Sequence, residues 1–183
     1  MQICVYGAAS DHIDPAYLEA GEALGLELAR RGHGLVFGGG QTGLMGAVAR
    51  GVVRGGGQLT GVAPRFFDQP GVLYDRCTRF IFTETMRERK SIMEAQADAF
   101  IMTPGGIGTF EEFYEILTLR QLGRHQKPIA MLNTRDYYAP LLQMQAQAMD
   151  QGFLQPECAN LFAAFAEPVA LLDYLETQWF PAA

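Results

Sequence analysis

Two adjacent carboxylates follow a glycine-rich stretch, and residues in this order could do chemistry on a bound anion. The stretch is Pro104-Gly105-Gly106-Ile107-Gly108-Thr109, and Glu111 and Glu112 come just after it. Closely spaced glycines let backbone N–H groups point toward one place, and a helix N-terminus adds a positive dipole end. We therefore expect a phosphate-binding turn, with both carboxylates within reach of a substrate held by its phosphate.

A structural role for the same residues is open as well. Thr109 and Glu112 have the spacing of a capping box, in which a threonine at the N-cap and a glutamate three residues later satisfy free backbone N–H groups. On this alternative Glu112 only stabilises the start of a helix. The spacing by itself does not choose between the two roles.

Arg89 and Lys90 form a second candidate pair. The segment 83–90 predicts the start of a helix that runs to about Ala97, with Thr85 and Glu88 as a capping box. The helix dipole disfavours basic residues in the early turns unless they face a bound anion. The alternative is a solvated first turn, and the dipole argument favours Arg89 and Lys90 as ligand contacts.

Two further turns of small residues follow predicted strands. The first, Gly7-Ala8-Ala9-Ser10, has Ser10 as its polar group, and the second carries the GxGxxG pattern at Gly38, Gly40 and Gly43. A dinucleotide site would place this pattern after the first strand, with an acidic residue about 20 positions further on. Neither condition holds here, so the second turn predicts phosphate or ribose binding rather than NAD binding.

Alternating strands and helices must bring these stretches together. Apolar patterns predict strands at 2–6, 35–37, 58–63, 79–82, 99–102, 127–132 and 159–165, and helices at 15–31, 47–54, 83–97, 109–119, 138–151 and 168–178. The alternation predicts an α/β fold with a doubly wound, Rossmann-like parallel sheet and helices on both faces. The small-residue turns would then lie at the carboxyl edge of the sheet. We expect residues 65–76 to act as a lid there, and residues 153–154 to begin a lid or an edge segment.

Length and composition limit the class of protein. The chain has 183 residues, which suits one domain over 1–183, and its net charge of −6 argues against a surface built for nucleic acid. It lacks the run of about 18 apolar residues that predicts a membrane span. The start of the chain has no signal-peptide pattern, so we expect a cytoplasmic protein. The three cysteines and three histidines are scattered, so we expect reduced thiols and no metal site.

Three motifs occur in order along nearly the whole chain. They are Gly38-Gly39-Gly40-x-x-Gly43-Leu44-Met45-Gly46, Met86-x-x-Arg89-Lys90 and Pro104-Gly105-Gly106-x-Gly108-Thr109-x-x-Glu112. In this combination the chain resembles the LONELY GUY (LOG) family. The resemblance implies a hydrolase that cleaves cytokinin riboside 5′-monophosphates to a free base and ribose 5-phosphate, without a metal or organic cofactor. It also implies a homodimer whose small-molecule partner is a nucleoside monophosphate.

The resemblance implies roles for particular residues. Arg89 and Glu112 become the catalytic pair, and the glycine loops hold phosphate and ribose. Cleavage of an N-glycosidic bond develops an oxocarbenium-like cation, so Glu112 would stabilise that charge and orient or deprotonate water. Arg89 is always charged and would bind phosphate or ribose oxygens, or stabilise the departing base. The implied binding residues are Ser10, Gly39, Gly40, Gly43, Met86, Lys90, Gly105, Gly106, Gly108 and Thr109.

The first turn departs from the family pattern. It reads Gly7-Ala8-Ala9-Ser10 where many relatives of this kind read Cys-Gly-Ser-Ser. Two polar contacts to the base or ribose are therefore missing from this turn, and Ser10 remains.

Two other functions stay open. A nucleosidase for unmodified AMP would use the same residues, whereas a carrier of a nucleotide or of molybdenum cofactor needs the glycine loops without Arg89 and Glu112. The joint presence of these two residues favours the enzyme. Similar sequences are also labelled lysine decarboxylases, but that chemistry uses a Schiff-base lysine on pyridoxal phosphate. Lys90 belongs to the Arg-Lys motif and Lys127 precedes a proline, so we reject that label.

Overall fold

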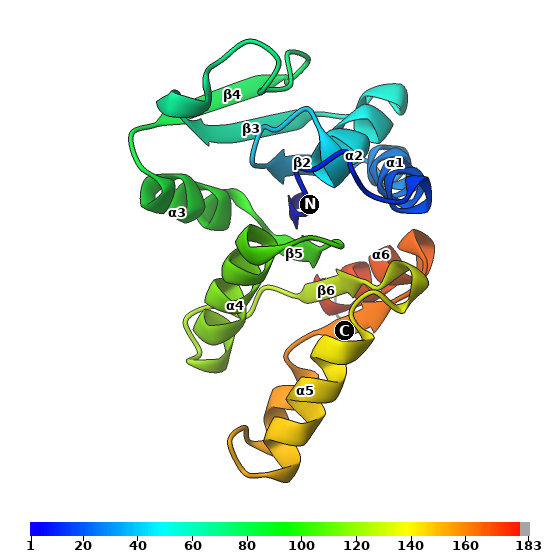
Figure 1. Cartoon of the computed structure of the whole chain (residues 1–183), viewed down its shortest axis with the longest axis vertical. Helices are drawn as coiled ribbons and strands as arrows, with labels where there is room; N and C mark the ends of the chain where they lie inside the picture. Colours follow the sequence, from blue (N-terminus) through cyan, green and yellow to red (C-terminus); the bar gives the residue numbers. More distant parts are fainter. Residues whose placement is uncertain (180–183) are drawn as a thin grey trace.

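A parallel sheet forms the centre of the computed structural model, which describes residues 1–179 (Figure 1). The strands of that part lie in the order β4-β3-β2-β1-β5-β6-β7, and every neighbouring pair is parallel. This confirms the predicted α/β class. The strands are β1 Gln2–Tyr6, β2 Gly34–Phe37, β3 Leu59–Pro64, β4 Arg79–Thr83, β5 Ala99–Met102, β6 Ile129–Leu132 and β7 Ala163–Phe165.

The last two strands are shorter than the sequence predicts. β6 begins at Ile129 rather than at 127, and β7 begins at Ala163 rather than at 159. Proline explains both differences, because it has no N–H to donate to a sheet. Pro128 directly precedes β6, and Pro156 starts a 3₁₀ turn, η3 Pro156–Asn160, which takes up residues assigned to β7.

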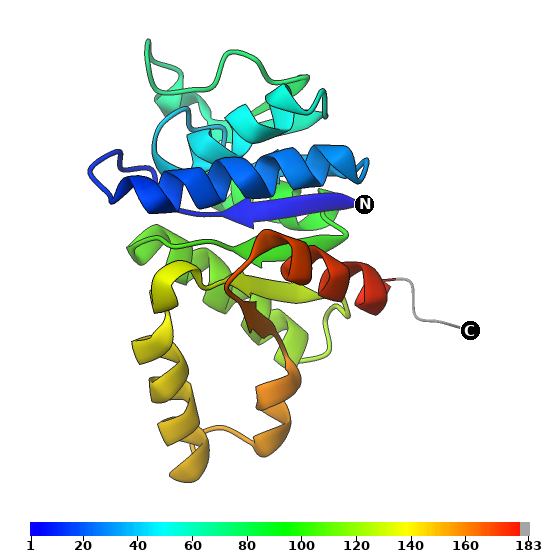
Figure 2. The ribbon, with the colours of Figure 1, turned by 90° about the vertical axis from the view of Figure 1, so that its right-hand side faces the viewer.

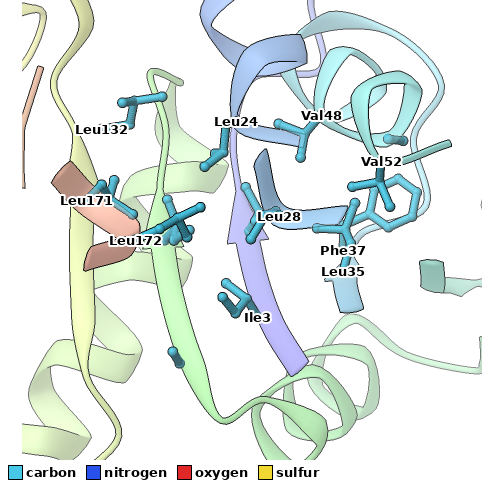
Figure 3. Packing of buried hydrophobic residues seen from close by; sticks show 14 of the residues in the cluster. Ile3, Leu24, Leu28, Leu35, Phe37, Val48, Val52, Leu132, Leu171 and Leu172 are labelled. Atoms are coloured by element: carbon cyan, nitrogen blue, oxygen red, sulfur yellow. The ribbon is translucent and has the colours of Figure 1, made fainter. Parts of the chain in front are cut away.

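Helices cover both faces of the sheet, as predicted. Side chains of β1 alternate between the faces: Ile3 and Val5 join the core under one set of helices, and Cys4 and Tyr6 join the core under the other. Figure 3 shows the first core, in which leucines and valines of α1, α2 and α6 pack on the sheet. The helices are α1 Pro15–Arg30, α2 Gly43–Arg54, α3 Met86–Gln96, α4 Ile107–Gln121, α5 Ala139–Asp150 and α6 Pro168–Trp179.

Two helical glycines let α1 and α2 approach closely. A Cβ atom at Gly25 would lie 2.0 Å from the carbonyl oxygen of Val48, and one at Gly51 would lie 2.1 Å from that of Glu22. Glycine within a helix costs about 1 kcal/mol relative to alanine, so close packing must offset this cost. The contact fixes α2, whose N-terminus borders the loop after β1.

The order of the strands reverses between β1 and β5. The chain builds the sheet outward from β1 through β2, β3 and β4, and then returns to pair β5 with the free side of β1. Tyr6 pairs with Met102, so the loops that follow these residues leave the sheet side by side. Such a switch point is where open α/β sheets bind ligands.

Of the two predicted capping boxes, one forms with Glu88 bonded to the residue before the N-cap, and the other does not form. At the start of α3 the Thr85 side chain accepts a hydrogen bond from Glu88 N, and Glu88 Oε2 accepts one from Glu84 N. Helix α4 instead begins at Ile107 with Gly106 as its N-cap, so Thr109 is its third residue. Glu112 therefore lies in the second turn, and its predicted alternative role as a capping residue is wrong.

Helix α5 extends beyond the edge of the sheet, and η3 returns beside it (Figures 1 and 2). None of the residues of α5 is buried, and the turn after α5 carries Phe153, which is 80% exposed. Residues 153–154 lie in this turn, beyond the edge of the sheet and outside the lining of the switch-point cavity, so of the two predicted alternatives the structure supports the edge segment and not the lid. Within residues 1–179, no helix has the length and hydropathy needed to span a membrane.

Candidate active site

A cavity of about 540 Å³ opens at the switch point. Its walls come from the turn after β1, the glycine loop after β2, the segment before β4, the start of α3 and the start of α4. The lining residues are Gly7, Ala8, Ala9, Ser10, Gly38, Gly40, Thr42, Met45, Phe67, Gly71, Val72, Leu73, Met86, Arg89, Gly106, Gly108, Thr109 and Glu112. The structure thus brings together the three stretches that the sequence singled out.

Eight of the twelve predicted site residues line this cavity: Ser10, Gly40, Met86, Arg89, Gly106, Gly108, Thr109 and Glu112. Three of the others are glycines that shape the loops. Gly39 and Gly43 have φ angles of +76° and +61°, in the region that favours glycine, and Gly105 packs against Thr109. The fourth, Lys90, lies outside the cavity lining.

The centre of the site is an ion pair between Arg89 and Glu112. Arg89 Nη1 donates to Glu112 Oε1 at 2.6 Å, and Arg89 Nε donates to the carbonyl oxygen of Val62 at 3.2 Å. The two side chains are only 7% and 10% exposed. Gly38 leaves room for the guanidinium, because a Cβ atom there would lie 2.1 Å from Arg89 Nη2.

Burial decides the proton affinity of Glu112. It raises the pKa of this carboxyl above its ordinary value, although the charge and hydrogen bond of Arg89 act to lower it. A carboxylate with a raised pKa is a stronger base near neutral pH. Arg89 is already engaged with Glu112 and Val62, which limits the part it can play as the predicted clamp on phosphate or ribose oxygens.

The two glycine loops differ in how their helix N-termini are satisfied. At α2, Gly43 N donates to Asp11 Oδ1 at 2.7 Å, so a carboxylate of the protein already occupies this end. At α4 no side chain among residues 1–179 caps the helix at Gly106. The free N–H groups and the dipole of α4 therefore face the cavity without a protein anion, which makes this end the better phosphate site.

Two tyrosines that the sequence reasoning missed hold the loop before α4. Tyr137 donates its hydroxyl hydrogen to the carbonyl oxygen of Gly105, and Tyr138 donates to that of Thr103, both at 2.7 Å. Thr103 Oγ1 in turn donates to the carbonyl oxygen of Tyr6 at 2.9 Å. The signal in the sequence was a pair of tyrosines a few residues after a strand that ends at the same edge as the site.

The segment 65–76 forms a side wall of the cavity. It is hydrogen-bonded to the second glycine loop, from Gln41 N to the carbonyl oxygen of Val72 at 3.0 Å and from Tyr74 N to that of Gly39 at 2.8 Å. Phe67, Val72 and Leu73 of this segment line the cavity. The predicted lid is therefore attached to the glycine loop in this structure and supplies an apolar surface.

Neither lysine of the chain reaches the cavity. Lys90 Nζ forms ion pairs with Glu111 and Glu115, and Lys127 Nζ donates to the carbonyl oxygen of Glu94 at 2.7 Å. The prediction of Lys90 as a direct ligand contact therefore does not match the structure. The position of both lysines also supports the rejection of Schiff-base chemistry. Residues 1–179 contain no cluster of His, Cys, Asp and Glu side chains that could hold a metal ion.

The fold and the site define a Rossmann-like protein with a switch-point cavity for a small phosphorylated ligand. Residues 45–175 match a family model described as possible lysine decarboxylase. A probable cytokinin riboside 5′-monophosphate phosphoribohydrolase of Oryza sativa subsp. japonica is 38% identical over 173 residues, which cover 94% of this chain and 82% of the relative. A cytokinin riboside 5′-monophosphate phosphoribohydrolase of Arabidopsis thaliana is 39% identical over 175 residues, which cover 96% and 81%. The chain therefore belongs to the LOG family.

Solved structures support the fold. The molybdenum cofactor carrier protein of Chlamydomonas reinhardtii superposes with a TM-score of 0.71 at 22% identity, over 97% of this chain and 96% of that one. The molybdenum cofactor binding protein of Rippkaea orientalis gives a TM-score of 0.70 at 21% identity, over 96% and 94%. At this level of identity the likeness concerns the fold alone.

Proposed function

We propose that this chain hydrolyses the N-glycosidic bond of adenosine 5′-monophosphates of the cytokinin type, giving a free base and ribose 5-phosphate. The observation that carries the proposal is the buried Arg89–Glu112 pair at the edge of a cavity whose other polar wall is an uncapped helix N-terminus. The names of the relatives from rice and Arabidopsis support the same activity.

Glu112 acts on water and on the sugar in this mechanism. The water oxygen bonds to C1′ of the ribose, and the bond between C1′ and the base nitrogen breaks with its electron pair passing to the base. Glu112 accepts the proton from water and stabilises the oxocarbenium-like charge, and the base takes a proton from solvent. Arg89 cannot serve as the acid because it stays charged, so its role is to hold Glu112 ionised and in place.

The remaining walls suit the other parts of a nucleotide. The N-terminus of α4 at Gly106 and Gly108 holds the phosphate, and Ser10 remains to contact the ribose or the base. Phe67, Leu73 and the other apolar residues of the wall surround the base. Ala8 and Ala9 line the cavity in the turn that departs from the family pattern, which makes this side more apolar still.

A direct assay tests the proposal. The purified chain is incubated with AMP and with isopentenyl-AMP, and release of ribose 5-phosphate is measured. We expect release from both, with kcat/KM roughly tenfold higher for isopentenyl-AMP, because burying about two of the five carbon atoms of the isopentenyl group against an apolar wall contributes about 1.5 kcal/mol. Equal values would make the chain a general AMP nucleosidase, and binding of both nucleotides without release would favour a carrier.

The carrier alternative rests on the structural neighbours named as molybdenum cofactor proteins. A carrier must bind and release its cargo unchanged, so it has no use for a basic carboxylate held beside a buried arginine. The Arg89–Glu112 pair therefore favours the hydrolase.

The surface around α5 is suited to a contact between two copies of the chain, so we infer a homodimer. A groove of about 490 Å³ runs between α4, α5 and η3, and its lining includes Leu117, Met144 and Phe153. Helix α5 has no buried residue and, along its twelve positions, one charged side chain, Asp150. Because one chain carries both the apolar groove and the exposed apolar side chains, a second copy can fill the groove across a two-fold axis.

Substitution of Met144 tests this assembly. We expect Met144→Glu to weaken the dimer about a hundredfold or more, because it places a charge in an apolar contact. Light scattering after size-exclusion chromatography would then show the mass of one chain at micromolar concentration. Gln143→Glu is the matched control, since it adds the same charge to an exposed position of α5 outside the groove lining. A parent protein that is already monomeric would contradict the proposal.

A cytoplasmic location is part of the same proposal. Cys4, Cys77 and Cys158 are free thiols in the structure, which suits a reducing compartment. Fractionation of cells that express the protein tests the location.

A further inference from the structure

A second charged cluster lies beside the catalytic pair and joins the same two helices. Lys90 of α3 places its ammonium between two carboxylates of α4, with Nζ 2.8 Å from Glu115 Oε2 and in contact with Glu111 Oε1. The Lys90 side chain is 17% exposed, while those of Glu111 and Glu115 are 53% and 43% exposed. The lysine is thus largely covered by the two carboxylates that it joins.

The two clusters are built from consecutive residues on each helix. Arg89 and Lys90 are neighbours on α3, and Glu111 and Glu112 are neighbours on α4. Consecutive residues point about 100° apart around a helix, so Arg89 and Glu112 meet in the interior while Lys90 and Glu111 meet nearer the surface. Lys90 therefore crosses between the helices at the same level as the catalytic pair.

We propose that Lys90 and Glu111 are positioning residues that hold Glu112 against Arg89 and control, in opposite senses, how readily Glu112 takes up a proton. The catalytic meaning of this inference rests on the proposed hydrolase function. The effect of Lys90 and Glu111 on the titration of Glu112 does not depend on that function, because it concerns one carboxyl group and the charges around it.

Charged or titratable groups face Glu112 from α3, α4 and β1. After burial, Arg89 and Lys90 of α3 act to lower the pKa of Glu112, and Glu111 of α4 acts to raise it. Cys4 and Tyr6 face it from β1, but burial raises the pKa of Cys4 to about 12 and that of Tyr6 well above its usual value. Both stay neutral in the working range, which leaves Lys90 and Glu111 as the adjustable charges.

Removing the charge of Lys90 and removing that of Glu111 should shift the pH profile in opposite directions. A purely structural role predicts no such opposite shifts. Removal of Lys90 leaves Glu112 easier to protonate, so the acid limb of kcat/KM moves to higher pH. Removal of the Glu111 charge leaves Glu112 harder to protonate, so the limb moves to lower pH. If Lys90 and Glu111 only linked α3 to α4, both variants would lose activity, and the acid limb would stay at the parental pH in both.

The experiment compares Lys90→Met, Glu111→Gln and Lys90→Arg in the full chain. Glutamate labelled with ¹³C at the side-chain carboxyl reports the titration of Glu112, whose signal is assigned by its loss in Glu112→Gln. We expect Lys90→Met to move this titration to higher pH and to lower kcat/KM at neutral pH about tenfold. Glu111→Gln should move the titration to lower pH, and Lys90→Arg should keep the parental profile.

Arg124→Gln is the matched control for the loss of a positive charge. Arg124 is exposed in the loop after α4, and its removal should leave the titration of Glu112 in place. Shifts of the same sign in Lys90→Met and Glu111→Gln, or no shift in either, would overturn the inference. A rise in KM for AMP with an unmoved titration would also overturn it and return Lys90 to a ligand contact. If the parent releases no ribose 5-phosphate, the proposed function fails, while the carboxyl titration still decides this inference.

Discussion

Glu112→Gln is expected to lower the turnover of the enzyme at least about a hundredfold, with the melting temperature changed by only a few degrees. The substitution removes the negative charge that faces the oxocarbenium-like ribose in the proposed mechanism. It keeps the shape of the side chain and an oxygen that can accept from Arg89 Nη1. Turnover is measured as release of ribose 5-phosphate at saturating substrate, and stability by thermal unfolding. Nucleotide binding should persist, because the proposed phosphate contacts lie on α4.

The small effect on stability follows from the sign of the pKa shift. The pKa of Glu112 is raised by folding, so the folded state favours the protonated, neutral form of this carboxyl. The free energy of unfolding therefore falls as pH rises through the raised pKa of Glu112, because the buried carboxyl becomes ionised. A neutral amide at this position does not ionise and causes no such loss. The unpaired charge of Arg89 sets the remaining cost, which the retained hydrogen bond limits.

The pH profile and a control complete this experiment. The parental acid limb should lie above the usual range of a glutamate, because burial raises the pKa of Glu112, and the Gln variant should lack this limb. The neighbouring Glu111 is unsuitable as a control because it pairs with Lys90. Glu19→Gln, on an exposed position of α1, makes the same change outside the cavity lining and should match the parent. Release of ribose 5-phosphate by Glu112→Gln at the parental rate would leave the carrier as the better explanation.

Gly106→Val should weaken nucleotide binding about a hundredfold or more while the chain still folds. A Cβ atom at Gly106 meets no other atom within 4 Å, and the φ angle of −103° lies outside the left-handed region that favours glycine. The isopropyl group therefore enters open cavity space at the N-cap of α4, where the phosphate must approach the N–H groups. Loss of two charge-assisted hydrogen bonds of about 1.5 kcal/mol each accounts for the size of the effect.

Calorimetry with AMP and thermal unfolding measure the two halves of this prediction. Ile107→Val is the control, since Ile107 is the next residue, is 87% exposed and does not line the cavity. This variant should bind AMP like the parent. If Gly106→Val bound AMP as tightly as the parent, the phosphate would not lie at α4. The N-terminus of α2 beside Asp11 would then be the remaining candidate for the phosphate site.

Local sequence patterns suffice to predict the class of fold and the three stretches that build the cavity. Short apolar runs alternating with helical patterns leave few alternatives to a parallel α/β sheet, and carboxyl-end turns of such a sheet must meet at one edge. The motifs that contain Arg89 and Glu112 also carried the family resemblance, which the relatives confirm. These features are local in the chain, so local patterns suffice to find them.

Features that depend on contacts between distant segments could not be predicted in this way. The tyrosines that hold the loop before α4 belong to the segment after β6, and the apolar wall is attached through hydrogen bonds to a glycine loop some 30 residues earlier. No periodicity or spacing in one stretch reports on such pairings. They form because the order of the strands places these loops side by side.

The partners of Glu112 and Lys90 depend on the tertiary structure. The sequence Thr109 to Glu112 fits a capping box and a catalytic turn equally well, and a cap contributes only about 1 kcal/mol, which long-range contacts easily outweigh. The N-cap of α4 is Gly106, three residues before the predicted cap, and Glu112 on the second turn of this helix faces Arg89. The same rotation of about 100° per residue turns Lys90 toward Glu111 and Glu115 and away from the cavity. Arg89 and Lys90, two neighbouring residues of one motif, thus have different partners because the phase of a helix is fixed by what it packs against.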